Sequence, residues 1–190
     1  MPVIIALLRG VNIGGHHKIK MGVLRALCES LEFQNVQTHL QSGNVVFRTR
    51  ERNLAKVSEL IQGAIERKVG FRPDVVLRTI PELREVIARN PFANRRGLDP
   101  SKYAVTFFTE APSKECRESV LKLKITPEEL RFEGREMHIY FPYGMARPNF
   151  SWSVVGRLLK TSGTSRNWNT VTKLLELAES LEAAGHARNA

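Results

Sequence analysis

The sequence predicts an α+β fold of two ferredoxin-like halves, each of the βαββαβ type, with a C-terminal helix that braces them. Three observations favour this class. Segments with strand and helix patterns follow one another in the order β-α-β-β-α-β over residues 1–80, and most of that order recurs after residue 100. The first strand is apolar at every position, so its sheet needs cover on both faces. A regular apolar stripe marks the final helix, over about 167–181.

The first half is expected to span residues 1–80. Apolar residues at helical spacing identify its helices, and short runs rich in Val, Ile and Leu identify its strands. The predicted elements are a strand over 3–8, a helix over about 20–31, strands over 36–40 and 43–49, a helix that Asn53 caps, and a strand over 74–79.

Residues 81–100 are expected to connect the two halves. Thr79 and Glu82 have the spacing of a capping box, and Pro81 suits a first helical turn, so a helix should run to about Arg89. The residue pair Asn90-Pro91 ends this helix, and residues 93–100 are predicted to form an exposed loop.

The second half, residues 101–160, is expected to be a partial copy of the first. The predicted elements are a strand over 103–109, a helix over 113–123, a hairpin of strands 130–132 and 137–141, and a helix over about 151–159. Residues 161–165 are predicted to form a turn, with the fourth strand missing or replaced. Residues 161–183 hold the C-terminal helix, Gly185 should end it, and residues 184–190 should be a loose tail.

The net charge of +10 is the one unusual feature of the overall composition. Asp and Glu do not occur in residues 1–28, 33–50 and 137–175, so the positive excess falls on the stretches that are also rich in Gly, Asn and Ser. This distribution favours an anionic ligand. The alternative is a general surface charge with no specific partner.

The composition also indicates the cellular compartment in which the protein is expected. No apolar run approaches 18 residues, and the apolar stretch after Pro2 is too short for a signal peptide, so we expect a cytoplasmic protein with no membrane contact. Cys28 and Cys116 lie far apart with no ligand-spaced partner, which predicts two buried thiols and no metal site. Nothing in the sequence indicates a cofactor, and the oligomeric state stays open.

Five segments together resemble the bacterial domain-of-unknown-function family numbered 1697. They are residues 6–15 (ALLRGVNIGG), 20–33 (KMGVLRALCESLEF), 41–47 (QSGNVVF), 142–151 (PYGMARPNFS) and 164–177 (TSRNWNTVTKLLEL). The resemblance implies a fold and a site but no reaction. One stretch departs from it: a Gly-x-x-Arg-Ser-Lys-Leu-like pattern is expected, and Arg147 is retained while Pro148 and Asn149 replace a Ser and a Lys.

The main candidate site lies where two polar turns are predicted to meet. In a βαββαβ sheet the first and third strands are antiparallel neighbours, so the end of one lies beside the start of the other. An arginine fork, a glycine-rich backbone and lysines at a helix start suit a phosphate or carboxylate. The expected ligand-binding residues are Arg9, Gly10, Asn12, Gly14, Gly15, Lys18, Lys20, Gln41, Ser42 and Asn44. The alternative is that both asparagines only cap turns and the glycines only provide positive φ angles.

A second cluster is predicted at the start of the last helix. An Arg and two Asn there suit an anion, and Trp168 either joins the core or stacks on a base. The candidate residues are Arg166, Asn167, Asn169 and Lys173, together with Arg147 from the loop before them.

Three functions compete. The first is binding of RNA or single-stranded nucleic acid through the basic turns. The second is an enzyme or sensor for a small phosphorylated or nucleotide ligand, and the third is a protein-interaction module. No catalytic residue set is recognisable, since His39 and His138 are the only evident general bases, and the sequence leaves open whether the protein is an enzyme.

Overall fold

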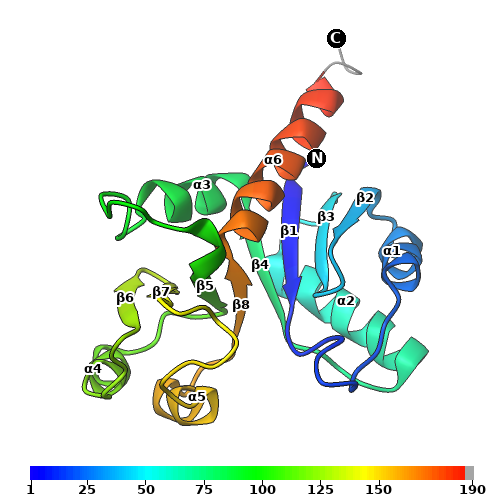
Figure 1. Ribbon diagram of the computed structural model, residues 1–190. Coiled ribbons are helices and arrows are strands. Elements are labelled where there is room, and N and C mark those ends of the chain that lie inside the picture. Colours follow the sequence, from blue (N-terminus) through cyan, green and yellow to red (C-terminus); the bar gives the residue numbers. More distant parts are fainter. Residues whose placement is uncertain (187–190) are drawn as a thin grey trace. The chain divides into compact units, whose positions relative to one another are not determined.

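The computed structural model describes residues 1–186. The chain divides into two compact units, the first made of residues 1–84 and the helix from Lys173 onward, the second of residues 85–172. Each unit contains a four-stranded antiparallel sheet with helices packed on it (Figure 1). Within residues 1–186, no helix combines the length and apolar character needed to cross a membrane. The predicted loose tail falls mostly on residues 187–190, which lie outside the described residues.

The first unit has the predicted βαββαβ order. Its elements are β1 (Val3–Leu8), α1 (Met21–Ser30), β2 (Gln34–His39), β3 (Asn44–Arg48), α2 (Leu54–Val69) and β4 (Val75–Thr79). The strands lie in the order β2-β3-β1-β4, and β1 pairs antiparallel with both β3 and β4. This is the ferredoxin-like arrangement, with the first and third strands as central neighbours.

The burial of β1 explains why its sequence is apolar throughout. Ile4, Ala6 and Leu8 join the core that α1 and α2 complete, while Ile5 and Leu7 point to the opposite face. All six residues of the strand are buried, as the run of apolar residues predicts. The predicted caps also form: the Asn53 side chain accepts a bond from the Lys56 N–H.

Helix α6 (Trp168–His186) runs past the predicted end at Gly185. Gly185 makes room for Arg48 inside this helix, because a Cβ at the glycine would lie 1.7 Å from the Arg48 guanidinium. Arg48 donates from Nη2 to the Glu182 carbonyl at 3.0 Å, a cation at the C-terminal end of a helix. An ion pair between Arg84 and Glu179, 2.7 Å long, also holds α6 within the first unit.

Helix α3 (Ile80–Ala88) carries the chain into the second unit, and the side chains of Thr79 and Glu82 bond to each other at its start. The elements that follow are a 3-10 helix (Pro100–Lys102), β5 (Tyr103–Phe108), α4 (Lys114–Leu121), β6 (Glu129–Glu133), β7 (Glu136–Tyr140), α5 (Trp152–Leu159) and β8 (Gly163–Asn167). The strand order β6-β7-β5-β8 repeats that of the first unit. Figure 1 shows α4 and α5 beside this sheet.

The predicted turn over residues 161–165 is wrong, because β8 completes the second sheet. This strand pairs antiparallel with β5, with Thr106 opposite Ser165 and Val105 opposite Arg166. Its sequence, Gly-Thr-Ser-Arg-Asn, has no apolar alternation, so periodicity could not reveal it. The hydroxyls of Thr106 and Ser165 lie 2.7 Å apart, so polar contacts replace apolar packing along this edge strand.

One face of the second sheet carries a buried polar group, His138, with no exposed surface. Its Nδ1 lies 2.5 Å from the Tyr103 hydroxyl. The Oδ1 atom of Asn90 accepts both the Phe92 N–H and the Tyr103 O–H, so the tyrosine proton is committed to Asn90. Nδ1 must then carry the imidazole proton, and Nε2 keeps a lone pair without a partner among the described residues.

We expect Gly185→Ala to be about 1 kcal/mol less favourable than Gly156→Ala, because the new methyl group displaces Arg48 from the Glu182 carbonyl and this loss offsets the gain in helix propensity. Urea unfolding measures this change. Gly156 in α5 is the matched control, since a Cβ there meets nothing within 4 Å and alanine should stabilise that helix by up to about 1 kcal/mol. In an Arg48→Ala background, Gly185→Ala should be as favourable as Gly156→Ala; a difference of the same size there would contradict the role of Arg48.

We expect acid to destabilise the protein through His138. Burial lowers the pKa of its imidazole from 6.5 to about 4, so the unfolded chain binds a proton in this pH range that the folded chain does not. The contribution is complete above pH 6.5 and is lost as the pH falls to about 4, up to about 3 kcal/mol. Urea unfolding of wild type and His138→Gln between pH 7 and 4 should show a smaller acid loss for the variant. Equal losses would mean that other groups carry the acid response.

Candidate functional site

The first unit contains a cavity of about 480 Å³ where the loop after β1 leads into α1. Its lining residues are Asn12, Gly15, Lys18, Ile19, Lys20 and Gln41. All of them except Ile19 belong to the set predicted from the sequence. The geometry follows from the sheet: Leu7 pairs with Asn44, so the loop after β1 continues past the start of β3 and meets the turn before it.

The side chain of Asn12 joins these two segments. Its Nδ2 donates to the Gln41 carbonyl at 2.7 Å and to the Ile19 carbonyl at 2.9 Å, while its Oδ1 accepts the Ile19 N–H at 2.9 Å. Asn12 also has a φ of +57°, a conformation that asparagine tolerates better than most residues. The amide is therefore engaged with the protein itself, and its role in the cavity is to hold the wall in place.

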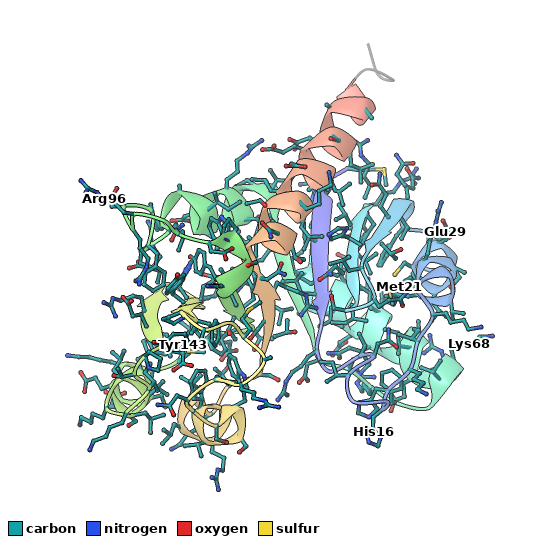
Figure 2. The ribbon with its side chains drawn as sticks, viewed as in Figure 1. His16, Met21, Glu29, Lys68, Arg96 and Tyr143 are labelled. Carbon is teal, nitrogen blue, oxygen red and sulfur yellow. The ribbon has the colours of Figure 1, made fainter. Side chains whose placement is uncertain are left out.

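Residues 12–17 form a small hairpin beside the cavity. The Asn12 N–H donates to the His17 carbonyl, and Ile13 pairs with His16. Gly14 and Gly15 have φ angles of +59° and +81°, both positive as a type I′ turn requires. The His17 ring stacks on Phe71 with 4.6 Å between ring centroids, which fixes the base of the hairpin. Figure 2 shows His16 pointing outward at the edge of the unit.

The turn before β3 is held by its own contacts. Asn44 is fully buried, and its Nδ2 donates to the His39 carbonyl at 2.7 Å and to the Ser42 hydroxyl at 3.0 Å. Gly43, with a φ of +72°, packs so tightly that a Cβ would lie 2.5 Å from the Val11 side chain. Ser42 and Asn44 therefore shape the turn and are not among the residues that line the cavity.

Arg9 extends from the end of β1 and pairs with Asp74. Its Nη1 lies 2.9 Å from the Asp74 carboxylate, and its N–H bonds the Asp74 carbonyl. The arginine side chain is 54% exposed, so this ion pair is a surface contact between the ends of β1 and β4. Neither Arg9 nor Gly10 lines the cavity.

Lys18 and Lys20 give the cavity its charge, and both are exposed. Lys20 is the residue before α1, and its side chain makes no capping bond. The first turn of α1 contains no acidic residue, so its N–H groups and the partial positive charge of the helix start add to the two ammonium groups. No lining residue is a carboxylate, which makes this part of the unit electropositive.

A second hollow of about 310 Å³ lies elsewhere in the first unit and has a different character. Glu32, Arg50 and Glu51 are among its lining residues, so charges of both signs face it. None of the predicted ligand-binding residues borders this hollow. The mixed charge makes it a poorer match for an anion than the cavity at α1.

The second predicted cluster is divided between two kinds of element. Arg166 was expected at a helix start but lies in β8, where it is buried and donates from Nη1 to the Thr164 hydroxyl at 2.6 Å and to the Ser165 carbonyl at 2.8 Å. Burial lowers the pKa of its guanidinium to about 10. The misplacement has the same cause as the missed strand, namely the absence of an apolar pattern around it.

The remaining members of that cluster have separate roles. Asn167 caps α6, because its Oδ1 accepts the Thr170 N–H at 2.8 Å, and Asn169 is exposed on the first turn of the helix. Trp168 is partly buried and stacks on Tyr103 with 4.5 Å between ring centroids. Lys173 belongs to the first unit and pairs with Glu176 at 2.9 Å, and Arg147 is exposed in the loop between β7 and α5.

The titratable candidates for chemistry do not line the cavity. Partial burial, and then the charge of Lys173, lower the pKa of His39, so its imidazole is neutral at neutral pH. Burial raises the pKa of the Cys28 thiol to about 12, which leaves it unreactive. Cys116 was expected to be buried as well, but it sits at the start of α4 and is only partly buried.

Comparisons with known proteins agree with this architecture. A family described as a protein of unknown function, DUF1697, matches residues 1–138. The solved structure of the conserved bacterial protein SP0830 from Streptococcus pneumoniae is similar, with a TM-score of 0.70 and 21% identity, over 93% of this chain and 98% of that one. At this identity the likeness shows the fold alone. No curated protein matches the chain. On the family match, which covers most of the sequence, the chain belongs to the DUF1697 family of proteins of unknown function.

Proposed function

We propose that this protein binds a small phosphate-bearing ligand in the cavity at the start of α1. The observation that carries the proposal is the composition of that cavity, in which two exposed lysines and an uncapped helix start border a hollow of about 480 Å³ without any carboxylate. A volume of this size falls within the range of about 300–1,000 Å³ that small-molecule sites occupy.

The electrostatics support a phosphate over a neutral ligand. Two lysines line the hollow beside the start of a helix, and an ammonium group and the partial positive charge of a helix start each stabilise an anion that replaces water nearby. The fixed parts of the wall also favour binding, because Asn12 holds the loop to Gln41 before any ligand arrives. A preorganised wall reduces the entropy that binding must overcome.

Nucleic acid, above all RNA or a single strand, is the other source of the same phosphate group. An extended strand needs several cations along its path. The predicted ligand-binding residues include six cations. Of these, Arg166 is buried, and Arg9 and Lys173 are engaged in ion pairs with Asp74 and Glu176. Fewer cations are therefore available along the path of an extended strand, which favours a compact ligand at Lys18 and Lys20.

Binding is the function that the lining residues support best. Among the described residues that border the cavity there is no His, Cys, Ser, Asp or Glu, so only the two lysines could serve as a nucleophile or general base, and no second group beside them completes a catalytic pair. A sensor or carrier of a phosphorylated small molecule fits this set of groups.

Thermal unfolding tests the proposal with inorganic phosphate, AMP and a short single-stranded oligonucleotide as probes. AMP or phosphate should raise the unfolding midpoint, because a ligand at 100 times its Kd stabilises the folded state by about 2.7 kcal/mol. The variant Lys18→Gln/Lys20→Gln separates the two sources of phosphate. A shift with AMP that this variant removes supports a small ligand in the cavity, whereas an oligonucleotide shift that this variant removes would assign the cavity to nucleic acid.

The double variant Lys18→Gln/Lys20→Gln should weaken binding of the active probe at least about 10-fold, since two charged hydrogen-bond donors are lost. Isothermal titration measures the affinity. The control is Lys122→Gln/Lys124→Gln, which removes two exposed lysines after α4 and should leave the affinity unchanged. Equal losses in both variants would mean that only the net charge of the protein matters, and the proposal would be wrong.

A further inference from the structure

The second unit presents two exposed aromatic rings from one short segment. Phe141, Pro142, Tyr143 and Gly144 form a tight turn, closed by a bond from the Gly144 N–H to the Phe141 carbonyl at 3.0 Å. Tyr143 lies at the tip of this turn with 90% of its surface exposed, so its ring contributes almost nothing to the core. Figure 2 labels Tyr143 in the loop that leads from β7 towards α5.

The second ring, Trp152, is supported from behind. Phe141 is buried, Phe150 stacks on it with 6.3 Å between centroids, and Trp152 meets Phe150 edge to face at 5.0 Å. Trp152 nevertheless keeps 41% of its surface exposed at the start of α5. These four residues, Phe141, Tyr143, Phe150 and Trp152, are called the aromatic ridge below. The ridge fixes one side of the indole and leaves the other side to solvent.

The loop behind the ridge is anchored to the rest of the unit. The Asn149 N–H donates to the Glu128 carboxylate at 2.9 Å, and the Asn149 side chain donates to the Thr126 carbonyl. These bonds hold the loop between Tyr143 and Trp152 against the segment before β6. The rings are therefore presented on a fixed loop, which lowers the entropy lost when a partner binds.

Exposed cations lie on the same stretch of the chain as the ridge. Arg147, Arg157 and Lys160 are all exposed, and residues 137–175 contain no Asp or Glu. Arg157 also suits the C-terminal end of α5, so this charge by itself has a structural explanation. Helix α4, which packs against α5, carries charges of both signs, and its Lys114 and Glu118 form an ion pair at 3.9 Å. The helix end explains a cation by itself, but it does not explain why exposed cations and exposed aromatic rings occur on the same segment.

We propose that the aromatic ridge and these three cations bind single-stranded nucleic acid, with bases stacked on Tyr143 and Trp152 and phosphates at Arg147, Arg157 and Lys160. Unpaired bases offer flat faces to both rings, and their backbone supplies the charge that the acid-free segment complements. A duplex hides its base faces, and an acidic peptide has no stacking group at each charge. This surface is separate from the cavity in the first unit and does not depend on the function proposed there.

Tryptophan fluorescence tests base stacking directly. The sequence has two tryptophans, and Trp168→Phe leaves Trp152 as the reporter while keeping an aromatic ring on Tyr103. Titration with oligouridylate should quench Trp152 and saturate. Inorganic polyphosphate, which has charge but no bases, and duplex RNA should not quench it. Quenching by none of the three, or equal quenching by polyphosphate, would overturn the proposal.

Anisotropy of a labelled single-stranded oligonucleotide measures the contribution of each ring. Tyr143→Ala and Trp152→Ala should each weaken binding about 10-fold, and Tyr143→Phe should restore it, because a phenyl ring also stacks. The matched control is Leu121→Ala, which removes an apolar side chain that is 53% exposed on α4, outside the ridge. Loss in the control equal to that in Tyr143→Ala would mean that no specific ring contact exists.

Salt dependence tests the phosphate contacts. Replacing Arg147, Arg157 and Lys160 together by Gln should reduce the slope of log K against log salt by about 2, at about 0.7 for each contact with a single strand. The variant Lys18→Gln/Lys20→Gln should leave oligonucleotide binding unchanged. If that variant abolishes binding while Tyr143→Ala does not affect it, the oligonucleotide binds at the cavity in the first unit and the ridge proposal is wrong.

Discussion

In the first unit, the position of β1 between two antiparallel neighbours determines where polar chemistry can lie. Every residue of β1 is buried, so the strand itself carries no functional group. Because Leu7 pairs with Asn44, the chain leaves β1 beside the turn that starts β3. The polar residues after the strand are therefore brought against that turn, and the Asn12 side chain ties the two together through the Gln41 carbonyl. This hydrogen bond, together with that from the Leu8 N–H to the Gly43 carbonyl, holds the two segments beside the cavity together.

The second unit repeats the topology but not the site, and the difference lies at the start of the first helix. In α4, Ser113 caps the helix by accepting the Cys116 N–H, and Glu115 follows in the first turn. Both features satisfy the positive end of the helix from within the chain. In α1 the residue before the helix is Lys20, without a capping bond or an acidic neighbour in the first turn. The same fold thus carries a closed helix start in one unit and an open, basic one in the other.

The two proposed surfaces depend on different physical interactions. The cavity at α1 uses ammonium groups and backbone N–H groups, which recognise the charge and size of an anion. The aromatic ridge uses exposed rings, which recognise the flat face of a base and tolerate any sequence. Membership of a family of unknown function and a fold likeness at 21% identity transfer neither activity, so both proposals depend on the chemistry of these side chains.

The sequence by itself determined what depends on near neighbours along the chain. It predicted the βαββαβ order, the cap at Asn53, and the box formed by Thr79 and Glu82, because apolar periodicity and capping act within a few residues. It also predicted most of the cavity lining, since antiparallel order places two turns together. Only the tertiary structure decided the rest. Strand β8 has no apolar pattern and exists through pairing with β5. Arg9 pairs with Asp74, 65 residues away, and such contacts leave no local trace in the sequence because they form only when the sheet brings distant segments together.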